Sequence, residues 1–290
     1  MERRLIINAD DFGICPSVNN AVRELVEQGL LKSVSVIPVC DGAAEASFLN
    51  DFPGVSAGIH LTTTSEWATD RWKPLGGFAS LTDIDGYLWK TAEDFGKYAK
   101  YKDVCAEINL QIKKMRKICP GINHADTHMG ALYGIFGNPL AIPIFIFFGK
   151  KHNLALRVFS KPVDNQRYKN FNPFVYRLGC FGCHILTSVS VVVTPDYILY
   201  PGDIDFSDNY NIFRNNMLDF LCGIPNGISE IYMHPSLDGS DVQSLCMDWK
   251  RRYYEYLLLK DNTFYNTLES AGIELVNYTE LIELKKINRK

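Results

Sequence analysis

The sequence predicts an α/β fold in which seven or eight mostly parallel strands close into a (β/α) barrel-like sheet. Short β-prone runs alternate with helical stretches along the whole chain, which favours parallel strands joined by helices. The number of these units favours barrel-like closure. With 290 residues and 47% hydrophobic content, the chain can bury one large core, so we expect a single domain over residues 1–290.

The expected strands are β-prone runs, and five of them end beside a side chain that could bind a metal or transfer a proton. In chain order the runs cover residues 5–7, 33–37, 55–59, 122–123, 154–156, 188–193, 228–233 and 272–276. Ligands of parallel α/β folds bind at the carboxyl ends of the strands. The side chains at these ends are therefore placed for chemistry.

The expected helices lie between these strands. They cover residues 18–27, 43–48, 104–118, 139–152, 211–222 and 242–259. The first begins after Pro16 and ends at Gly29, which are helix start and stop signals. The third has apolar residues at helical spacing from Val104 to Met115, which predicts one buried face.

Residues 62–102 interrupt the alternation with a Thr-, Trp- and Gly-rich stretch. A connection of this length inside a compact domain is usually functional, often as a lid or binding loop. It follows His60 directly, so we expect this insertion near the active site. Its aromatic rings could stack on a sugar or form a small satellite core, and they belong to Trp67, Trp72, Tyr87 and Trp89.

Composition narrows the classes of partner. The formal net charge of -3 gives no electrostatic reason to expect nucleic acid. About four apolar residues precede Asn8, too few for a signal peptide, and the longest apolar run, 141–148, is too short for a membrane span. We therefore expect a cytoplasmic protein without a membrane partner, in which the eight cysteines are reduced thiols. The basic C-terminal residues, 285–290, are expected to form a solvated tail.

One cysteine cluster matches the pattern for c-type haem attachment: Cys180, Cys183 and His184, with one Cys-x-x-Cys-His spacing. That attachment accompanies export, for which the chain carries no signal. A zinc knuckle would need a second pair of cysteines, and none follows. We expect a loop here.

Two adjacent carboxylates, Asp10 and Asp11, stand where the first apolar run ends. By themselves they could be a turn that caps the next helix. However, His60, His128 and His234 also fall at expected strand ends. Two imidazoles and one carboxylate leave coordination positions open, as a catalytic metal site requires, and suit zinc, iron, cobalt or nickel, or magnesium or manganese with more water.

His124, Asp126 and His128 alternate with a period of two. In an extended segment all three would point to one face, and in a helix His124 and His128 would still share a face. In either case Asp126 is close enough to orient a metal-binding imidazole by accepting its hydrogen bond.

Five segments together resemble the YdjC-like (chitooligosaccharide) deacetylases. They are NADDFG at 8–13, GIHLT at 58–62, HADTH at 124–128, LR at 156–157 and HPS at 234–236. They occur in that family's order and span nearly the whole chain. The resemblance implies a (β/α) barrel hydrolase that uses a divalent metal to remove acetyl groups from N-acetylated sugars or oligosaccharides. The bond cleaved would be a carbon–nitrogen bond other than a peptide bond.

The same resemblance implies the site residues. Asp11, His60 and His128 are expected to bind the metal, with magnesium or zinc first and cobalt or manganese as alternatives. Asp126 would orient an imidazole, and His124 would support the strand end rather than bind the metal.

The proton-transfer residues follow by the same comparison. Asp10 is expected to be the general base and His234 the general acid. Arg157 would position the reacting groups or stabilise an oxyanion, although it could equally be a buried salt-bridge partner. The partner is a small acetylated sugar, and the resemblance also implies a homodimer.

The match has departures, and two other functions stay open. Residues 129–133 follow HADTH where the family commonly has further histidines, and Ser236 stands where glycine is usual. The family's sugar specificity is therefore not assigned to this chain. A 2-His-1-carboxylate iron oxygenase could use His124 and Asp126 with His184 or His234, but the helix-rich alternation argues against that class. A non-catalytic sugar-binding pseudoenzyme is the other alternative, and sugar binding without turnover would identify it.

Overall fold

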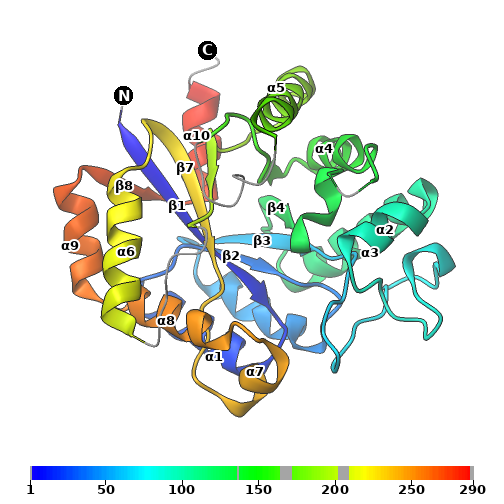
Figure 1. The fold of residues 1–290 in the computed structure, drawn as a ribbon, viewed down its shortest axis with the longest axis horizontal. Helices are drawn as coiled ribbons and strands as arrows, with labels where there is room; N and C mark the ends of the chain where they lie inside the picture. Colours follow the sequence, from blue (N-terminus) through cyan, green and yellow to red (C-terminus); the bar gives the residue numbers. More distant parts are fainter. Residues whose placement is uncertain (1, 136, 164–171, 202–208, 288–290) are drawn as a thin grey trace.

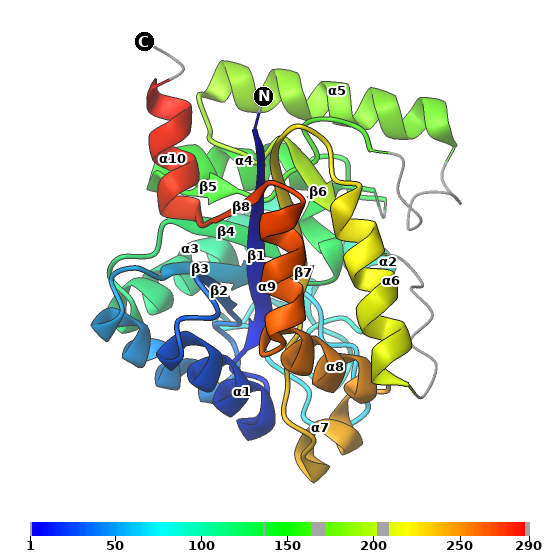
Figure 2. The same cartoon turned by 90° about the vertical axis from the view of Figure 1, so that its left-hand side faces the viewer.

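The computed structural model of the protein describes residues 2–135, 137–163, 172–201 and 209–287. Eight strands in this part of the chain pair in parallel in the order β5-β4-β3-β2-β1-β7-β6, with β8 against the first half of β1. They are β1 (Arg3–Phe12), β2 (Ser33–Val36), β3 (Ser56–Leu61), β4 (His124–Thr127), β5 (Ala155–Leu156), β6 (Tyr197–Leu199), β7 (Gly227–Met233) and β8 (Ile273–Val276). The sheet curls into a half-barrel surrounded by helices (Figures 1 and 2). The predicted barrel-like α/β fold class is confirmed.

Backbone hydrogen bonds connect the two edges of the sheet. The Leu156 N–H on β5 donates to the Val193 carbonyl oxygen (2.9 Å), and the Lys161 N–H donates to that of Asp196 (3.1 Å). The Asp196 N–H in turn donates to the carbonyl oxygen of Ile228 on β7 (2.8 Å). The chain that leads into β6 therefore bridges β5 and β7.

The helices surround this sheet. They are α1 (Pro16–Glu27), α2 (Ala92–Tyr98), α3 (Tyr101–Ile118), α4 (Ala141–His152), α5 (Pro173–Ser190), α6 (Tyr210–Cys222), α7 (Ser240–Leu245), α8 (Trp249–Leu259), α9 (Asn262–Ser270) and α10 (Tyr278–Ile287), with 3-10 helices η1 (Asp41–Asp51), η2 (Ala79–Leu81) and η3 (His128–Tyr133). The predicted helices at 18–27, 104–118, 139–152 and 211–222 are confirmed as α1, α3, α4 and α6. The one predicted at 43–48 is the longer 3-10 helix η1. Among the described helices, none is long and apolar enough to cross a membrane.

Four predictions about the helical parts were wrong. The helix predicted at 242–259 divides into α7 and α8, because Cys246 is extended (φ −113°, ψ 121°) without a proline or glycine to signal the break. The strand predicted at 188–193 overlaps the end of α5, and the loop expected at Cys180–His184 lies inside the same helix. The expected tail is part of α10, where Lys285 forms an ion pair with Asp196 (2.9 Å), and residues 288–290 lie outside the described residues.

β1 is the central strand of the sheet, and its packing explains its sequence. Leu5, Ile6 and Ala9 are completely buried, because β7 lies along one side of the strand and β8 and β2 along the other. A near-continuous apolar run is typical of such a strand. The carboxyl ends of β1, β3, β4 and β7 meet at one end of the half-barrel, where the polar residues follow.

Candidate active site

The end of β1 brings two neighbouring carboxylates to one place. The apolar run of the sequence predicted a strand that ends at Ile7, whereas β1 continues to Phe12. Adjacent side chains of a regular strand point to opposite faces. Asp11, however, has a left-handed backbone (φ 64°), and the register with β2 shifts between Ala9 and Phe12. Aspartate tolerates this conformation better than most residues. Asp10 and Asp11 consequently both approach His60, at 3.9 and 3.4 Å.

Three donor atoms lie close together at the strand ends. Asp11 Oδ1 is 3.4 Å from His60 Nε2 and 3.4 Å from His128 Nδ1, and the two imidazole nitrogens are 3.3 Å apart. All three residues are buried. Ligand atoms about 2.0–2.1 Å from a tetrahedral ion are separated by roughly 3.3–3.4 Å. The triangle therefore has the size that a divalent metal site requires.

The two carboxylate oxygens of Asp11 differ in their hydrogen-bond partners, and this difference supports a metal site. Oδ2 accepts a hydrogen bond from Arg252 Nη1 on α8 (2.9 Å). Oδ1 is buried and has no hydrogen-bond partner among the described residues. Burial alone would raise the pKa of Asp11, but the Arg252 guanidinium, His128 and His234 hold it well below its usual range. An ionised oxygen thus faces the two imidazoles, and a bound cation would satisfy it.

His60 is oriented by Asp126 from the neighbouring strand. β3 and β4 pair these two residues directly, and His60 Nδ1 lies 2.5 Å from Asp126 Oδ1. The carboxylate accepts a hydrogen bond from Nδ1–H, which leaves Nε2 facing Asp11. Burial lowers the pKa of His60, but Asp126 and Asp10 raise it above the ordinary value. The same negative charges would attract a cation.

His128 is oriented by a residue that sequence analysis missed. Its Nε2 lies 2.9 Å from Glu66 Oε2, so Nδ1 is the nitrogen that faces Asp11. Burial lowers the pKa of His128, but Glu66 and Asp11 raise it to about 10. Trp67 and Trp72 pack beside the imidazole with ring centroids 6.1 and 5.5 Å away. The 62–102 segment thus supplies an acid and two aromatic walls.

The other aromatic residues of the 62–102 segment lie away from His128. Trp89 stacks on Tyr98, and Tyr87 lies under the guanidinium of Arg71. Leu81 and Leu88 are completely buried. Both leucines belong to the main hydrophobic core, so the segment packs on that core rather than forming the satellite core, and it places two aromatic rings beside His128.

Arg157 connects three buried carboxylates. Its Nη1 and Nη2 donate to the two oxygens of Asp10 (2.6 and 2.7 Å), and Nη2 also lies 2.8 Å from Asp126 Oδ2. Its Nε donates to Glu230 Oε1 (2.7 Å). Burial raises the pKa of Glu230 to about 7. All three guanidinium nitrogens are used in ion pairs, which matches the salt-bridge alternative for Arg157.

His234 follows β7 and approaches the triad from the other side. Its Nε2 is 3.9 Å from Asp11 Oδ2, and its side chain is 25% exposed, whereas Asp11 is 2% exposed. The backbone N–H of His234 donates a hydrogen bond to Glu255 Oε2 on α8 (2.6 Å). The backbone N–H of Ser236, the residue that stands where the family usually has glycine, donates a hydrogen bond to the Arg252 carbonyl oxygen (3.1 Å). This contact helps to hold α8 in place.

His124 begins β4 rather than following a strand. Its ring is completely buried and stacks on Tyr278 at 4.0 Å, and its Nε2 lies 3.1 Å from Asn8 Oδ1. Burial lowers its pKa to about 3, so it is neutral at pH 7. β3 places Gly58 directly opposite, where a Cβ would lie 2.2 Å from His124 Nε2.

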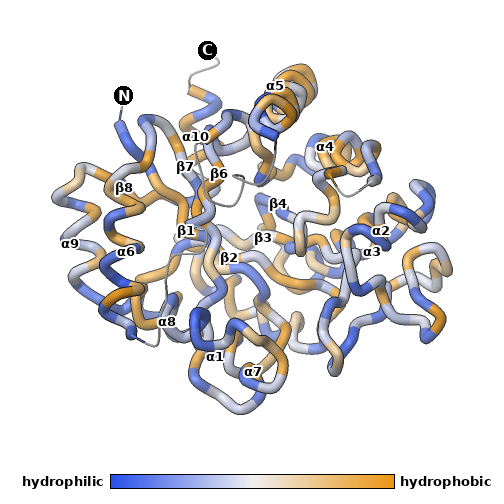
Figure 3. The backbone as a smooth tube through the Cα atoms, viewed as in Figure 1, coloured by the Kyte–Doolittle hydropathy of each residue, from blue (hydrophilic) through white to orange (hydrophobic). Residues whose placement is uncertain are grey.

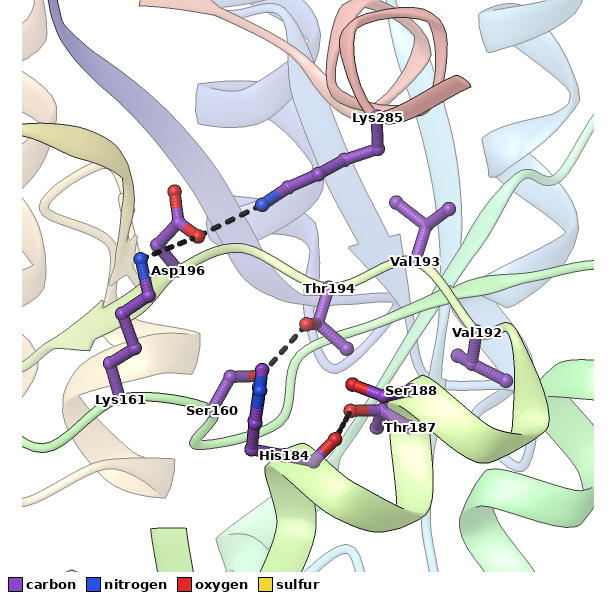
Figure 4. Close-up of a pocket in the computed structure, with 10 residues that line it drawn as sticks. All are labelled: Ser160, Lys161, His184, Thr187, Ser188, Val192, Val193, Thr194, Asp196 and Lys285. Carbon is purple, nitrogen blue, oxygen red and sulfur yellow. Dashed lines mark hydrogen bonds and ion pairs between the residues drawn. The ribbon is translucent and has the colours of Figure 1, made fainter. Parts of the chain in front are cut away.

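Among the described residues, two groups of three donors are close enough to hold one ion. They are Asp11, His60 and His128, and Asp10, His60 and Asp126. Arg157 already neutralises the second group. Neither group includes His124, His184 or His234, so the donor set of the iron oxygenase alternative is not assembled. His184 instead lines a pocket with Asp196 and Lys285 beneath α5 (Figure 4).

Known proteins resemble this chain over nearly its full length. The family model described as YdjC-like protein matches residues 4–270. A carbohydrate deacetylase of Listeria welshimeri is 33% identical over 287 residues, which covers 96% of this chain and 100% of the relative. One from Thermoanaerobacter pseudethanolicus is 27% identical and covers 96% and 98%. The crystal structure of an Enterococcus faecalis protein named for cellobiose-phosphate cleavage has a TM-score of 0.76 at 25% identity and covers 97% of this chain and 99% of that one.

Proposed function

Because this chain belongs to the YdjC-like family, as its motifs predicted, we propose that it is a divalent-metal-dependent hydrolase that removes acetyl groups from N-acetylated sugars or oligosaccharides. One observation carries the proposal: the buried, unpartnered Asp11 Oδ1 lies 3.4 Å from both His60 Nε2 and His128 Nδ1. Relatives named carbohydrate deacetylases match the chain almost from end to end, which supports the substrate class.

Asp11, His60 and His128 would hold the metal. When bound, a divalent cation polarises the amide carbonyl and lowers the pKa of water toward about 7. Two imidazoles among three protein ligands favour zinc or cobalt, whereas magnesium or manganese would need more oxygen ligands from water. Asp126 and Glu66 fix the imidazole nitrogens that face this position.

Asp10 is the residue we propose as general base. Its Oδ1 already accepts hydrogen bonds from Arg157 Nη2 and Asn8 Nδ2. Its Oδ2 accepts a hydrogen bond from Arg157 Nη1 alone among the described residues. Oδ2 therefore has a lone pair left to accept the proton of the attacking water. Arg157 is a positioning residue in this scheme, because its bidentate pair with Asp10 fixes the direction of both oxygens.

His234 is the residue we propose as general acid. It is the partly exposed imidazole at the site, so it can reach a sugar amine that enters from solvent. A protonated imidazole can donate to the nitrogen as the carbon–nitrogen bond breaks, so that the amine leaves neutral. Trp67, which is partly exposed beside His128 and packs on the buried Trp72, supplies apolar surface against which a sugar ring can pack.

The test is acetate release from a panel of N-acetylated mono- and oligosaccharides. Protein stripped with a chelator would be reloaded separately with zinc, cobalt, magnesium or manganese. We expect at least one metal to restore release, and Asp10→Asn to abolish it while metal binding persists. Sugar binding without acetate release, in metal-replete protein, would instead identify a pseudoenzyme.

A further inference from the structure

A pocket of about 170 Å³ lies beneath the second half of α5 (Figure 4). Its walls come from four places: the segment after β5, the segment before β6, α5 and α10. None of its described lining residues belongs to the proposed metal site or to the proposed proton-transfer residues. Pockets for drug-sized ligands measure about 300–1,000 Å³. This pocket therefore suits a small molecule rather than an oligosaccharide.

Hydroxyl groups line this pocket although the helix above it is apolar. Figure 3 shows α5 as predominantly hydrophobic, but the helix places Thr187 and Ser188 at the pocket. From the segments beside the sheet, Ser160 Oγ lies 2.8 Å from Thr194 Oγ1 (Figure 4). A hydroxyl group can donate or accept a hydrogen bond, so it adapts to a polar ligand. The lining therefore fits a polar occupant.

Two lysines of the pocket share one carboxylate oxygen. Lys285 Nζ lies 2.9 Å and Lys161 Nζ lies 3.2 Å from Asp196 Oδ1. The other oxygen of Asp196 accepts a hydrogen bond from the backbone N–H of Ile228 (2.9 Å). Asp196 is the one carboxylate among the described residues that line the pocket. Two ammonium groups thus face a single negative charge, and positive charge is in excess.

This charge balance selects an anion. A metal cation would need the Asp196 oxygen that both ammonium groups already use. Each ammonium group has three N–H donors, and its contact with Asp196 uses one of them. The end of α5 does not oppose an anion with open carbonyl groups, because those of Thr187 and Ser188 accept hydrogen bonds from the backbone N–H groups of Val192 and Val191 (3.0 and 3.1 Å).

From these observations we infer that the pocket beneath α5 binds a phosphate group, carried by inorganic phosphate or by a small phosphate ester. Lysine binds phosphate as a point charge, whereas the paired N–H groups of arginine match a carboxylate best. The described lining contains two lysines and no arginine. A phosphate ester carries a charge of about −1.5 to −2 at pH 7, which the excess positive charge would attract. The inference is independent of the proposed deacetylase activity.

The test titrates the protein with inorganic phosphate and, separately, with glycerol phosphate, and measures binding by calorimetry. We expect one phosphate group per chain, and the tighter of the two ligands identifies its source. Lys161→Met and Lys285→Met should each weaken binding at least about tenfold, because each removes a hydrogen bond to a charged group. Either variant leaves Asp196 one ammonium partner, so neither leaves its carboxylate unpaired.

Three further variants separate this pocket from other sites. Lys260→Met is the matched control, since Lys260 also pairs with a carboxylate, Glu24, outside the pocket, and should leave binding unchanged. Ser188→Leu keeps both lysines but should block the pocket with a larger side chain. Asp11→Asn should retain binding, which excludes phosphate held at the proposed metal site.

Loss of phosphate binding in both lysine variants and in Ser188→Leu, with unchanged circular dichroism, would support the inference. Three results would overturn it. They are a wild type that binds neither ligand at millimolar concentration, binding that survives the lysine variants, and acetate that binds as tightly as phosphate.

Discussion

Glu66 Oε2 lies 2.9 Å from His128 Nε2, on the side of the imidazole opposite Asp11. This contact joins the long 62–102 connection to the triad, because it determines which nitrogen of His128 faces the proposed metal. Asp126 does the same for His60 across the β3–β4 pair. Each of the two triad imidazoles thus has its own carboxylate, one from a strand and one from the connection.

Removal of the Glu66 carboxylate should weaken metal binding. We expect Glu66→Ala to lower the affinity for zinc or cobalt about 10–100-fold, because His128 loses the group that orients it. Glu66→Gln keeps a hydrogen-bond acceptor and should lose less. Titration calorimetry would measure both, with the exposed Glu45→Gln as control. Equal affinity in Glu66→Ala and wild type would show that the contact does not matter for the metal.

The proposed role of His234 predicts a dependence on the leaving group. His234→Gln should slow release from an N-acetylated sugar about 10²–10⁴-fold, because the nitrogen must gain a proton to leave as a neutral amine. Release from an aryl acetate should fall much less, since a phenolate leaves without a proton. His184→Gln, on α5, is the control. A similar loss on both substrates would remove His234 from the role of general acid.

Gly58 and His124 predict a steric effect on stability. Gly58→Ala would place a Cβ about 2.2 Å from the buried His124 ring, which has Tyr278 stacked against it and cannot retreat freely. We expect a loss of about 1–3 kcal/mol in the free energy of unfolding. Gly54→Ala has open space around its Cβ and should be nearly neutral. Urea unfolding of the two variants would decide, and equal stability would contradict the packing described.

His124 should make stability depend on pH. The folded pKa of about 3 lies below the ordinary 6.5 because the ring is buried, so the unfolded chain binds more protons in this window. Stability should therefore fall as the pH drops from 6.5 toward 3, by about 1.4 kcal/mol per pH unit from this residue. His124→Phe keeps the ring and cannot titrate. Urea unfolding at pH 7 and 5 should show a loss smaller by about 2 kcal/mol in the variant, and identical losses would argue against a buried neutral His124.

The sequence was sufficient for the parts of the fold that local patterns determine. α1 and α3 have helix signals and apolar spacing. The expected strand ends carry His60, His128 and His234 and the carboxylates Asp10, Asp11 and Asp126. The choice of Asp11, His60 and His128 among them as metal ligands came from the family resemblance. α5 was missed because its apolar residues face outward, and the Val- and Ser-rich segment at its end resembles a strand.

The contacts between distant segments could not be predicted. Arg252 reaches Asp11 from a helix 241 positions away, and Glu66 lies in a segment without a regular pattern. Such partners depend on tertiary packing. The left-handed Asp11 is likewise a property of the register between β1 and β2, although its acidic side chain is compatible with that backbone.

The most direct test of the central claim measures metal content and acetate release on the same samples of wild type and Asp11→Asn. We expect wild type to bind one divalent ion per chain and to release acetate from an N-acetylated sugar in proportion to that ion. Asp11→Asn should lose both, because the amide removes the charge that faces the two imidazoles. Acetate release by metal-free wild type, or by Asp11→Asn at the wild-type rate, would contradict the account.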